Sequence, residues 1–205
     1  MLAPGSRHAI FRFRFNHIKA SIIADTWPKM MDLAFPGVDQ HSKLDKTDWY
    51  YEFPNSSQVW FAGLDDKERV EKVLGQEYAT LFFNECSQIP YASRVMAISR
   101  LAQNVLKTDG QPLRLKAYYD MNPIGMAHWT YRLFVEKRDP DRRTFVPNPE
   151  NYAAIVMNPD HNKENLPAAY LQELDRMPEA ARRRFFLGQF ANISDSQLWS
   201  LELLD

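Results

Sequence analysis

The sequence is poor in cysteine and glycine, and it contains no long hydrophobic run. Its single cysteine, Cys86, excludes an internal disulfide and a zinc site built from cysteines. No apolar stretch approaches the ~20 residues that a membrane span needs, and no signal peptide opens the chain. Seven glycines against 13 prolines favour many fixed turns. An intracellular, reducing compartment without membrane contact is therefore the expected location.

What is present is the composition of an ordinary globular domain. The 205 residues can bury a sizeable core, and one domain is the simplest expectation. Hydrophobic residues make up 45% and charged residues 25% of the chain, as in soluble proteins. The net charge is -1, so no field of the whole chain attracts nucleic acid, and such a contact depends on local basic patches.

The most informative segment is an apolar run, residues 78–83, that ends in Asn84 and Glu85. Its β-branched and aromatic residues are typical of a strand buried on both faces. In an open α/β sheet, ligands sit in the crevice beyond the carboxyl ends of the strands, so a carboxylate there is well placed for chemistry. In a nucleotide hydrolase the first polar residue helps to hold Mg²⁺, and the next acid orients or deprotonates water. The alternative is a strand that simply ends in a polar turn.

A second buried strand is predicted at residues 113–119, and Asp120 and Asn122 follow it. Strands that alternate with helices favour a mostly parallel sheet, so both polar strand ends can face the same edge. One end would then hold the metal and water while the other senses the terminal phosphate. Asn122-Pro123 is also a common turn pair, so a plain turn remains the alternative.

The remaining pattern alternates strands and helices without internal repeats. Further strands are predicted at residues 8–15, 49–53, 59–62 and 153–157, of which the second and third form a hairpin. Helices are predicted at residues 17–33 with a kink at Pro28, and at 67–74, 91–106, 129–136, 166–174 and 178–187. Residues 35–46 are predicted to form a loop.

Two groups of arginines are candidate contacts for DNA or phosphate. Arg12 and Arg14 share one face of the first strand. Arg182, Arg183 and Arg184 lie together on an amphipathic helix. A solvated face is the alternative for both groups, because arginine side chains are mostly exposed.

Five segments in a fixed order resemble the ATPase domain of tailed-phage terminase large subunits, the motors that pump DNA into a procapsid. They are G-L-D-D (63–66), L-G-Q-E-Y (74–78), F-F-N-E-C-S-Q-I (82–89), M-N-P-I-G-M-A-H-W (121–129) and R-R-R-F-F-L-G-Q-F (182–190). The resemblance covers nearly the whole chain. It implies an α/β, P-loop NTPase-like fold of the RecA/ASCE type, with a mainly parallel sheet and helices on both faces.

The resemblance also implies roles for the residues at the strand ends. Glu85 matches the catalytic carboxylate, and Asn84 matches the metal-side position of the Walker B motif. Asn122 matches the coupling motif that senses hydrolysis, with Asp120 beside it. The implied cofactors are ATP and Mg²⁺. A neutral amide at position 84 is a poorer partner for Mg²⁺ than the usual aspartate.

The sequence departs from the family pattern because it contains no G-x-x-x-x-G-K-[ST] phosphate-binding loop. In the family that loop precedes the strand predicted at residues 8–15, so the expected fold is incomplete at the N-terminus. The family's nuclease domain would begin where this chain stops. We therefore expect a partial ATPase domain over residues 1–190 and the start of a linker over 191–205, inactive as an ATPase by itself.

The implied function is ATP hydrolysis coupled to translocation of double-stranded DNA, in the cytoplasm of the host cell. The implied partners are duplex DNA, the portal protein, a small terminase subunit and further copies of the chain in a ring. Two alternatives stay open at this point. One is a non-catalytic remnant that binds DNA or a protein, and the other is a different P-loop-type motor such as a helicase.

Overall fold

The computed structural model describes residues 3–38, 41–65, 70–71 and 74–191. The helix predicted at residues 67–74 lies largely outside these ranges. By its internal contacts the chain divides into two compact units, Met1–Met121 and Asn122–Asp205, and each is described by itself. The predicted boundary at residue 190 borders the end of the described chain and stays a prediction.

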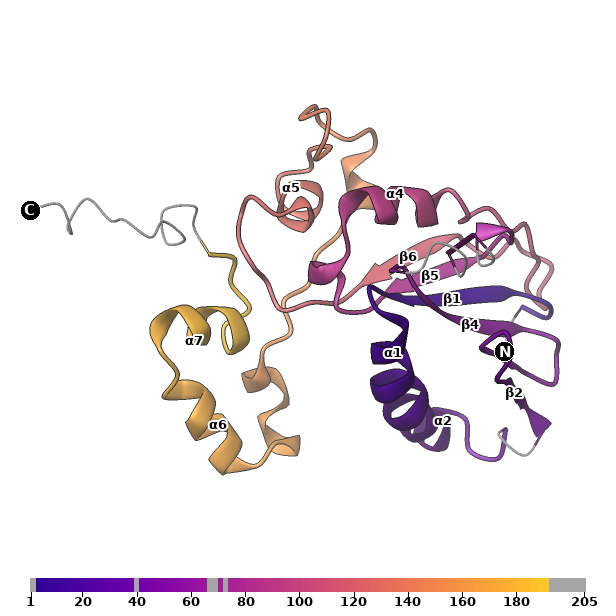
Figure 1. Cartoon of the computed structure of the whole chain (residues 1–205), viewed down its shortest axis with the longest axis horizontal. Helices are drawn as coiled ribbons and strands as arrows, with labels where there is room; N and C mark the ends of the chain where they lie inside the picture. Colours follow the sequence, from indigo (N-terminus) through magenta and orange to yellow (C-terminus); the bar gives the residue numbers. More distant parts are fainter. Residues whose placement is uncertain (1–2, 39–40, 66–69, 72–73, 192–205) are drawn as a thin grey trace, which may run out of the picture. The chain divides into compact units, whose positions relative to one another are not determined.

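The first unit is built on a six-stranded sheet with the order β2-β3-β4-β1-β5-β6 (Figure 1). Four strands run parallel: β1 (Arg7–Arg12), β4 (Gln58–Gly63), β5 (Thr80–Phe83) and β6 (Lys116–Tyr119). The strands β2 (Lys43–Asp45) and β3 (Tyr50–Glu52) add an antiparallel edge next to β4. The mainly parallel sheet and the hairpin are therefore confirmed, and β2 lies in a segment predicted as loop.

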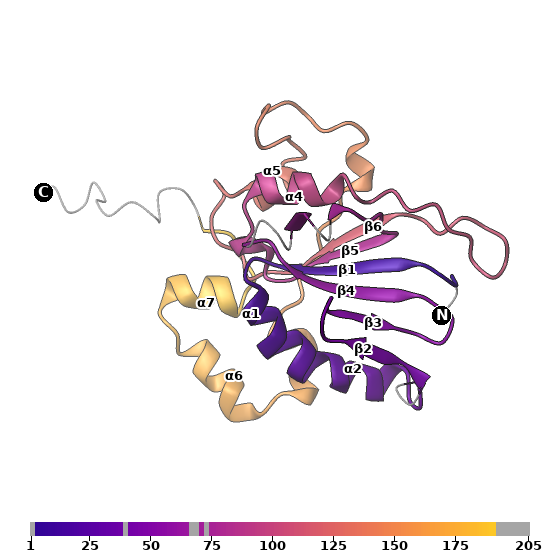
Figure 2. The ribbon, with the colours of Figure 1, turned by 45° about the vertical axis from the view of Figure 1, so that its right-hand side comes forward.

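Both faces of the central strands are covered. A continuous helical run of α1 (Phe15–His17), the π-helix η1 (Ile18–Thr26) and α2 (Trp27–Ala34) lies on one face. The helix α4 (Tyr91–Ile98) lies on the other face (Figure 2). Pro28 lies in the first turn of α2, directly after the π-helical stretch, so its missing N–H falls where the hydrogen-bond pattern of the helical run changes.

The strand register explains why β1 and β5 bury side chains on both sides. Ile10 pairs with Phe61 and Phe82 on the face of α2, whereas Phe11 pairs with Phe83 on the opposite face. Phe11 and Phe83 are fully buried, and their ring centroids lie 5.4 Å apart. Such two-sided burial is typical of parallel strands that helices cover on both faces.

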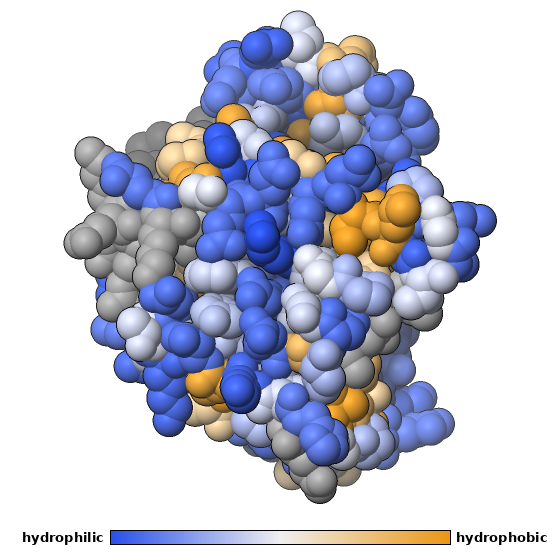
Figure 3. Space-filling model, turned by 90° about the vertical axis from the view of Figure 1, so that its right-hand side faces the viewer, coloured by the Kyte–Doolittle hydropathy of each residue, from blue (hydrophilic) through white to orange (hydrophobic). Residues whose placement is uncertain are grey.

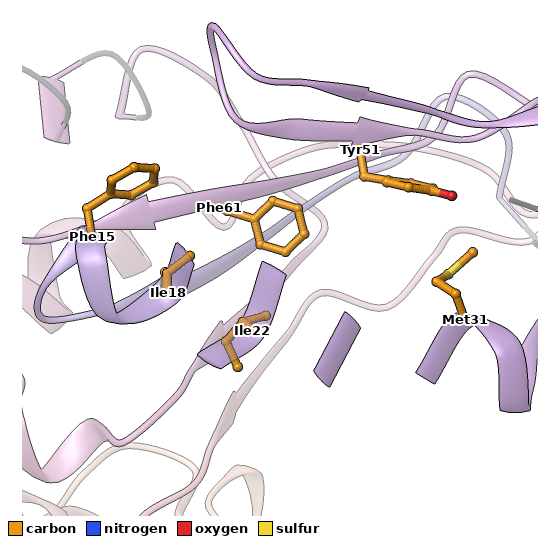
Figure 4. Packing of buried hydrophobic residues seen from close by; sticks show 6 residues of the cluster. All are labelled: Phe15, Ile18, Ile22, Met31, Tyr51 and Phe61. Atoms are coloured by element: carbon orange, nitrogen blue, oxygen red, sulfur yellow. The ribbon is translucent and has the colours of Figure 1, made fainter. Parts of the chain in front are cut away.

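The hydrophobic core on the α2 face packs the helical run against the hairpin strands β3 and β4. Phe15, Ile18, Ile22 and Met31 pack with Tyr51 and Phe61 of the sheet (Figure 4). Trp27 completes this contact, since its ring lies edge-on to Phe61 with the centroids 5.2 Å apart. The aromatic-rich composition is thus used to fix the helical run that follows β1.

Three predictions about secondary structure were wrong in extent or kind. The helix at 91–106 ends at Ile98, because the backbone at Arg100 and Ala102 bonds to Tyr78 instead of continuing the helix. The strand at 113–119 is confined to β6, an edge strand that is not buried, with Tyr118 50% exposed. Residues 153–157 form no strand, since their backbone has no strand beside it in the described chain, and Ile155 remains 85% exposed.

The second unit is made of short helices and loops. Its helices are α5 (Trp129–Phe134), η4 (Pro149–Asn151), η5 (Pro159–Asn165), α6 (Ala168–Asp175) and α7 (Glu179–Phe185). The predicted helix pair at 166–187 is confirmed as α6 and α7. Bridges between Gly125 and Ala191, and between Arg138 and Phe145, tie its loops together.

The surface carries no extended apolar band on the side that Figure 3 shows. That face is mostly hydrophilic, and its hydrophobic side chains form small separate patches. Among the described residues, no helix is long and apolar enough to cross a membrane.

Candidate active site at the carboxyl edge of the sheet

The ends of β5 and β6 bring three of the predicted residues together. The two strands are parallel neighbours, and Phe83 pairs with Tyr119 as their last residues. Asn84 and Glu85 therefore leave the sheet beside Asp120, at the same edge. The prediction that the two polar strand ends meet is confirmed for these three residues.

Asp120 is the acceptor at the centre of this group. Its carboxylate accepts hydrogen bonds from Asn84 Nδ2, at 2.9 Å to one oxygen and 3.2 Å to the other. The same carboxylate accepts the backbone N–H of Glu85 at 2.7 Å. The backbone of Asp120 is fixed as well, since its N–H donates to Phe83 O and its carbonyl accepts Cys86 N–H. The side chain is thus presented from a rigid position.

Glu85 occupies an unusual backbone conformation. Its φ of 51° and ψ of 47° lie in the left-handed region, which costs an L-residue about 1–2 kcal/mol. Strained residues of this kind concentrate at functional sites, where surrounding contacts hold them. The half-buried Glu85 carboxylate forms no hydrogen bond or ion pair within the described part of the chain. The turn therefore presents a carboxylate that can engage a water molecule.

Cys86 is the buried residue that follows Glu85 in this turn. It is buried at the start of the 3-10 helix η3 (Cys86–Gln88), and its N–H donates to Asp120 O at 2.9 Å. Burial raises the pKa of the Cys86 thiol to about 12, and the charges of Asp120 and Glu85 add to the shift. The thiol is therefore structural rather than reactive, because the thiolate is the nucleophile.

We expect Cys86 to resist alkylation in the folded chain. With its pKa raised to about 12, the thiol is almost wholly protonated at pH 8, and the rate with iodoacetamide should be at least ~10²-fold below that of the unfolded chain. Mass spectrometry of samples quenched in native buffer and in urea measures the two rates. Equal rates would show that the turn after β5 opens freely.

The predicted arginine contacts at the N-terminal strand have different surroundings. Arg12 is the last residue of β1, so it lies at the same edge as the ends of β5 and β6. Its Nη1 donates to Ser21 Oγ at 2.5 Å, while its Nε is buried without a partner among the described atoms. Arg14 is exposed and lies outside β1, at the N-cap of α1, so the prediction that it shares a strand face with Arg12 was wrong. Contact of either residue with phosphate or DNA stays a prediction.

The basic cluster of the second unit is partly neutralised. Arg182 Nε donates to Asp175 Oδ1 at 3.0 Å, and Arg183 Nε lies 3.7 Å from Glu179 Oε1. Arg184 places its guanidinium 4.8 Å from the centre of the Phe185 ring. Ion pairs between α6 and α7 and within α7 thus involve two of the three arginines, and contact of the cluster with DNA stays a prediction.

Asn122 is the first residue of the second unit. It follows Asp120 by two residues and is exposed. Whether its side chain shares a site with Glu85 therefore stays a prediction.

Comparison with known proteins identifies the family. A family model described as phage terminase large subunit matches residues 3–186. The chain belongs to the phage terminase large-subunit family. The PBSX phage terminase large subunit of Bacillus subtilis (strain 168) is 29% identical over 137 residues, which are 62% of this chain and 29% of that protein. The chain therefore spans less than a third of this terminase relative.

Solved terminases show the same fold. The large terminase of a thermophilic bacteriophage superposes with a TM-score of 0.70 at 17% identity, over 92% of this chain and 41% of that protein. The ATPase domain of the Thermus phage P74-26 large terminase gives a TM-score of 0.54 at 15% identity, over 92% and 78%. The fold is thus the P-loop NTPase-like fold of terminase ATPase domains. Structures of the first of these two terminases in complex with ADP and with ATP-gamma-S have TM-scores of 0.67 and 0.66.

The chemistry of the terminase strand ends fits a magnesium ion completed by phosphates. Mg²⁺ in nucleotide sites is held by one or two carboxylates together with phosphate oxygens and waters. Glu85 and Asp120 offer two carboxylates, and Asn84 offers an amide oxygen. Among the described residues, no group of three or more His, Cys, Asp and Glu side chains is placed to hold a metal alone. The protein donors are therefore sufficient only when a nucleotide supplies the rest.

Two features of the site could not be found from the sequence pattern. The spacing identified Asp120 as a strand-end residue, but it did not indicate that Asp120 accepts hydrogen bonds from both Asn84 and Glu85. No local signal marks the left-handed conformation of Glu85, which glycine would adopt more readily.

Proposed function

We propose that this chain forms part of the ATPase motor of a phage terminase, in which ATP hydrolysis drives double-stranded DNA into a procapsid. The observation that carries the proposal is the group of Asn84, Glu85 and Asp120 at the carboxyl edge of a mainly parallel sheet. Ligands of open α/β sheets bind beyond that edge. Membership in the terminase large-subunit family favours this motor over a helicase.

In this proposal each strand-end residue has a separate task. Glu85 orients or deprotonates the water that attacks the terminal phosphate, because the turn holds its backbone while no other described side chain engages its carboxylate. Asn84 and Asp120 form the polar floor beside it. When bound with ATP, Mg²⁺ would neutralise charge that develops on the phosphates.

The proposed partners are those of a packaging motor. They are duplex DNA, the portal protein, a small terminase subunit and further copies of the chain arranged in a ring, in the host cytoplasm. Arg12, Arg14 and the cluster Arg182, Arg183 and Arg184 are the proposed phosphate or DNA contacts. Among these, Arg12 has the strongest support, since its buried Nε lacks a protein partner in the described chain.

The test separates coupling from hydrolysis. In a complete terminase that carries this segment, Asn122→Ala is expected to reduce ATP turnover by less than about tenfold and DNA packaging by more, because its proposed task is to link phosphate loss to movement. Turnover is measured by phosphate release, and packaging by protection of DNA from nuclease. Asn151→Ala, at another exposed asparagine of the second unit, serves as the control.

Equal losses of turnover and packaging in Asn122→Ala would remove the coupling role. Unchanged packaging would do so as well. A complete protein that binds DNA but releases no phosphate would favour the alternative of a non-catalytic binding module.

A further inference from the structure

The amide at position 84 stands where a nucleotide hydrolase of this fold usually carries an aspartate. The carboxylate has not disappeared from the edge, because Asp120 supplies one from the neighbouring strand β6. The two side chains touch directly, with Asn84 Nδ2 at 2.9 Å and 3.2 Å from the two Asp120 oxygens. The end of β5 thus carries a neutral amide at position 84 that contacts a carboxylate at the end of β6.

This contact requires one amide and one carboxylate. An ionised carboxylate only accepts hydrogen bonds, so its partner at this distance must donate. An aspartate at position 84 would set two negative charges about 3 Å apart, which is destabilising. An amide at position 84 is therefore compatible with the carboxylate of Asp120, whereas a second carboxylate is not.

The same carboxylate also reaches the backbone of Glu85. Its oxygen accepts the Glu85 N–H at 2.7 Å, directly at the residue with φ 51°. A charge-assisted bond of this kind is stronger than a bond between neutral groups, so it can offset the cost of the left-handed conformation. Asp120 is itself anchored by backbone bonds to Phe83 O and from Cys86 N–H.

We infer that Asp120 is the positioning residue for Glu85 and that Asn84 and Asp120 form a hydrogen-bonded amide–carboxylate pair across β5 and β6. Asp120 holds the turn that directs the Glu85 carboxylate, and Asn84 keeps Asp120 in that orientation. The purpose of this arrangement rests on the proposed function, in which Glu85 activates water. The contact between Asn84 and Asp120 does not rest on the proposed function, so it can be tested on the 205-residue chain without nucleotide.

The decisive variant exchanges the two side chains. Asn84→Asp alone brings two carboxylates together, and Asp120→Asn alone removes the charge that the Glu85 N–H meets. The double variant N84D/D120N restores one donor amide and one acceptor carboxylate, with an amide oxygen left for the Glu85 N–H. A double-mutant cycle then isolates the coupling between the two positions.

The first measurement is the rate at which the Glu85 amide proton exchanges with water, followed by NMR. The second is the melting temperature of each variant. We expect exchange to become roughly 5–30-fold faster in Asn84→Asp and in Asp120→Asn. In the double variant we expect exchange to be slower than the two single effects together predict, but not fully restored, because the Glu85 N–H then meets a neutral amide oxygen. The melting temperature should fall by at most roughly 3–6 °C in the single variants. A positioning role therefore predicts faster exchange of the Glu85 amide proton together with only a small fall in the melting temperature.

A matched control is Asp109→Asn. Asp109 is exposed and its carboxylate also accepts a backbone N–H, that of Gln111 at 3.0 Å. This variant should speed exchange at Gln111 and leave the Glu85 amide unchanged. Faster exchange at Glu85 in this control would mean that the probe reports general loosening and would overturn the inference.

Two further results would also overturn it. One is exchange at Glu85 that stays at the value of the unchanged chain in both single variants. The other is a double variant whose losses equal the sum of the two singles. Failure of the proposed ATPase function would change neither readout, so the two hypotheses fail separately.

Discussion

Glu85→Gln in a complete terminase that carries this segment is expected to lower ATP turnover by a factor on the order of 10²–10⁴, the usual contribution of one general base. The change keeps the size of the side chain and removes its charge. The backbone bond from the Glu85 N–H to Asp120 is retained, so the turn should keep its conformation. Turnover is measured under saturating ATP with DNA present.

Nucleotide affinity is the control for this variant. Affinity should stay within about threefold of the parent, because a general base acts on the attacking water rather than on the bound ground state. Glu77→Gln makes the same chemical change at an exposed residue just before β5 and should leave turnover unaffected. Unchanged turnover in Glu85→Gln would remove this residue from the catalytic role, and an equal loss of affinity would indicate misfolding.

The sequence was sufficient for the central strands. The apolar run at 78–83 predicted β5, because strands buried on both faces need apolar side chains at nearly every position. The alternating run at 8–15 predicted β1, although that strand ends at Arg12. The abrupt polarity of Asn84 and Glu85 then located the edge that carries the candidate site. These features follow from local pattern and the geometry of parallel sheets.

Other features depended on contacts that no local pattern encodes. The helix α4 stops after Ile98 because the backbone at Arg100 and Ala102 bonds to Tyr78, which lies far earlier in the sequence. The run at 153–157 has the composition of a strand, yet the described chain places no strand beside it. Strand formation depends on neighbours, so composition alone overpredicts it.

The residues of the candidate site could be predicted from the sequence, but the hydrogen bonds between them could not. Strand-end position identified Asn84, Glu85 and Asp120. Which of two carboxylates would accept the Asn84 amide depends on register, and register is set by pairing between β5 and β6. The hydrogen bond between Asn84 and Asp120 therefore follows from the strand register and not from the local sequence.

The 205-residue chain by itself is expected to hydrolyse ATP poorly or not at all. It contains no phosphate-binding loop sequence, so the β- and γ-phosphates lose the lysine and the backbone N–H groups that would position them. Phosphoryl transfer depends almost entirely on such positioning and on charge stabilisation.

Phosphate release from the chain with ATP and Mg²⁺ checks this directly, and the matched sample is the same chain joined to an upstream segment with the loop. Turnover should appear only in the joined protein and should vanish there in Glu85→Gln. Robust turnover by the 205-residue chain that is lost in Glu85→Gln would contradict the prediction. It would also require a second phosphate cradle built from residues of this chain, for which the buried, unpartnered Nε of Arg12 at the sheet edge would be the first candidate.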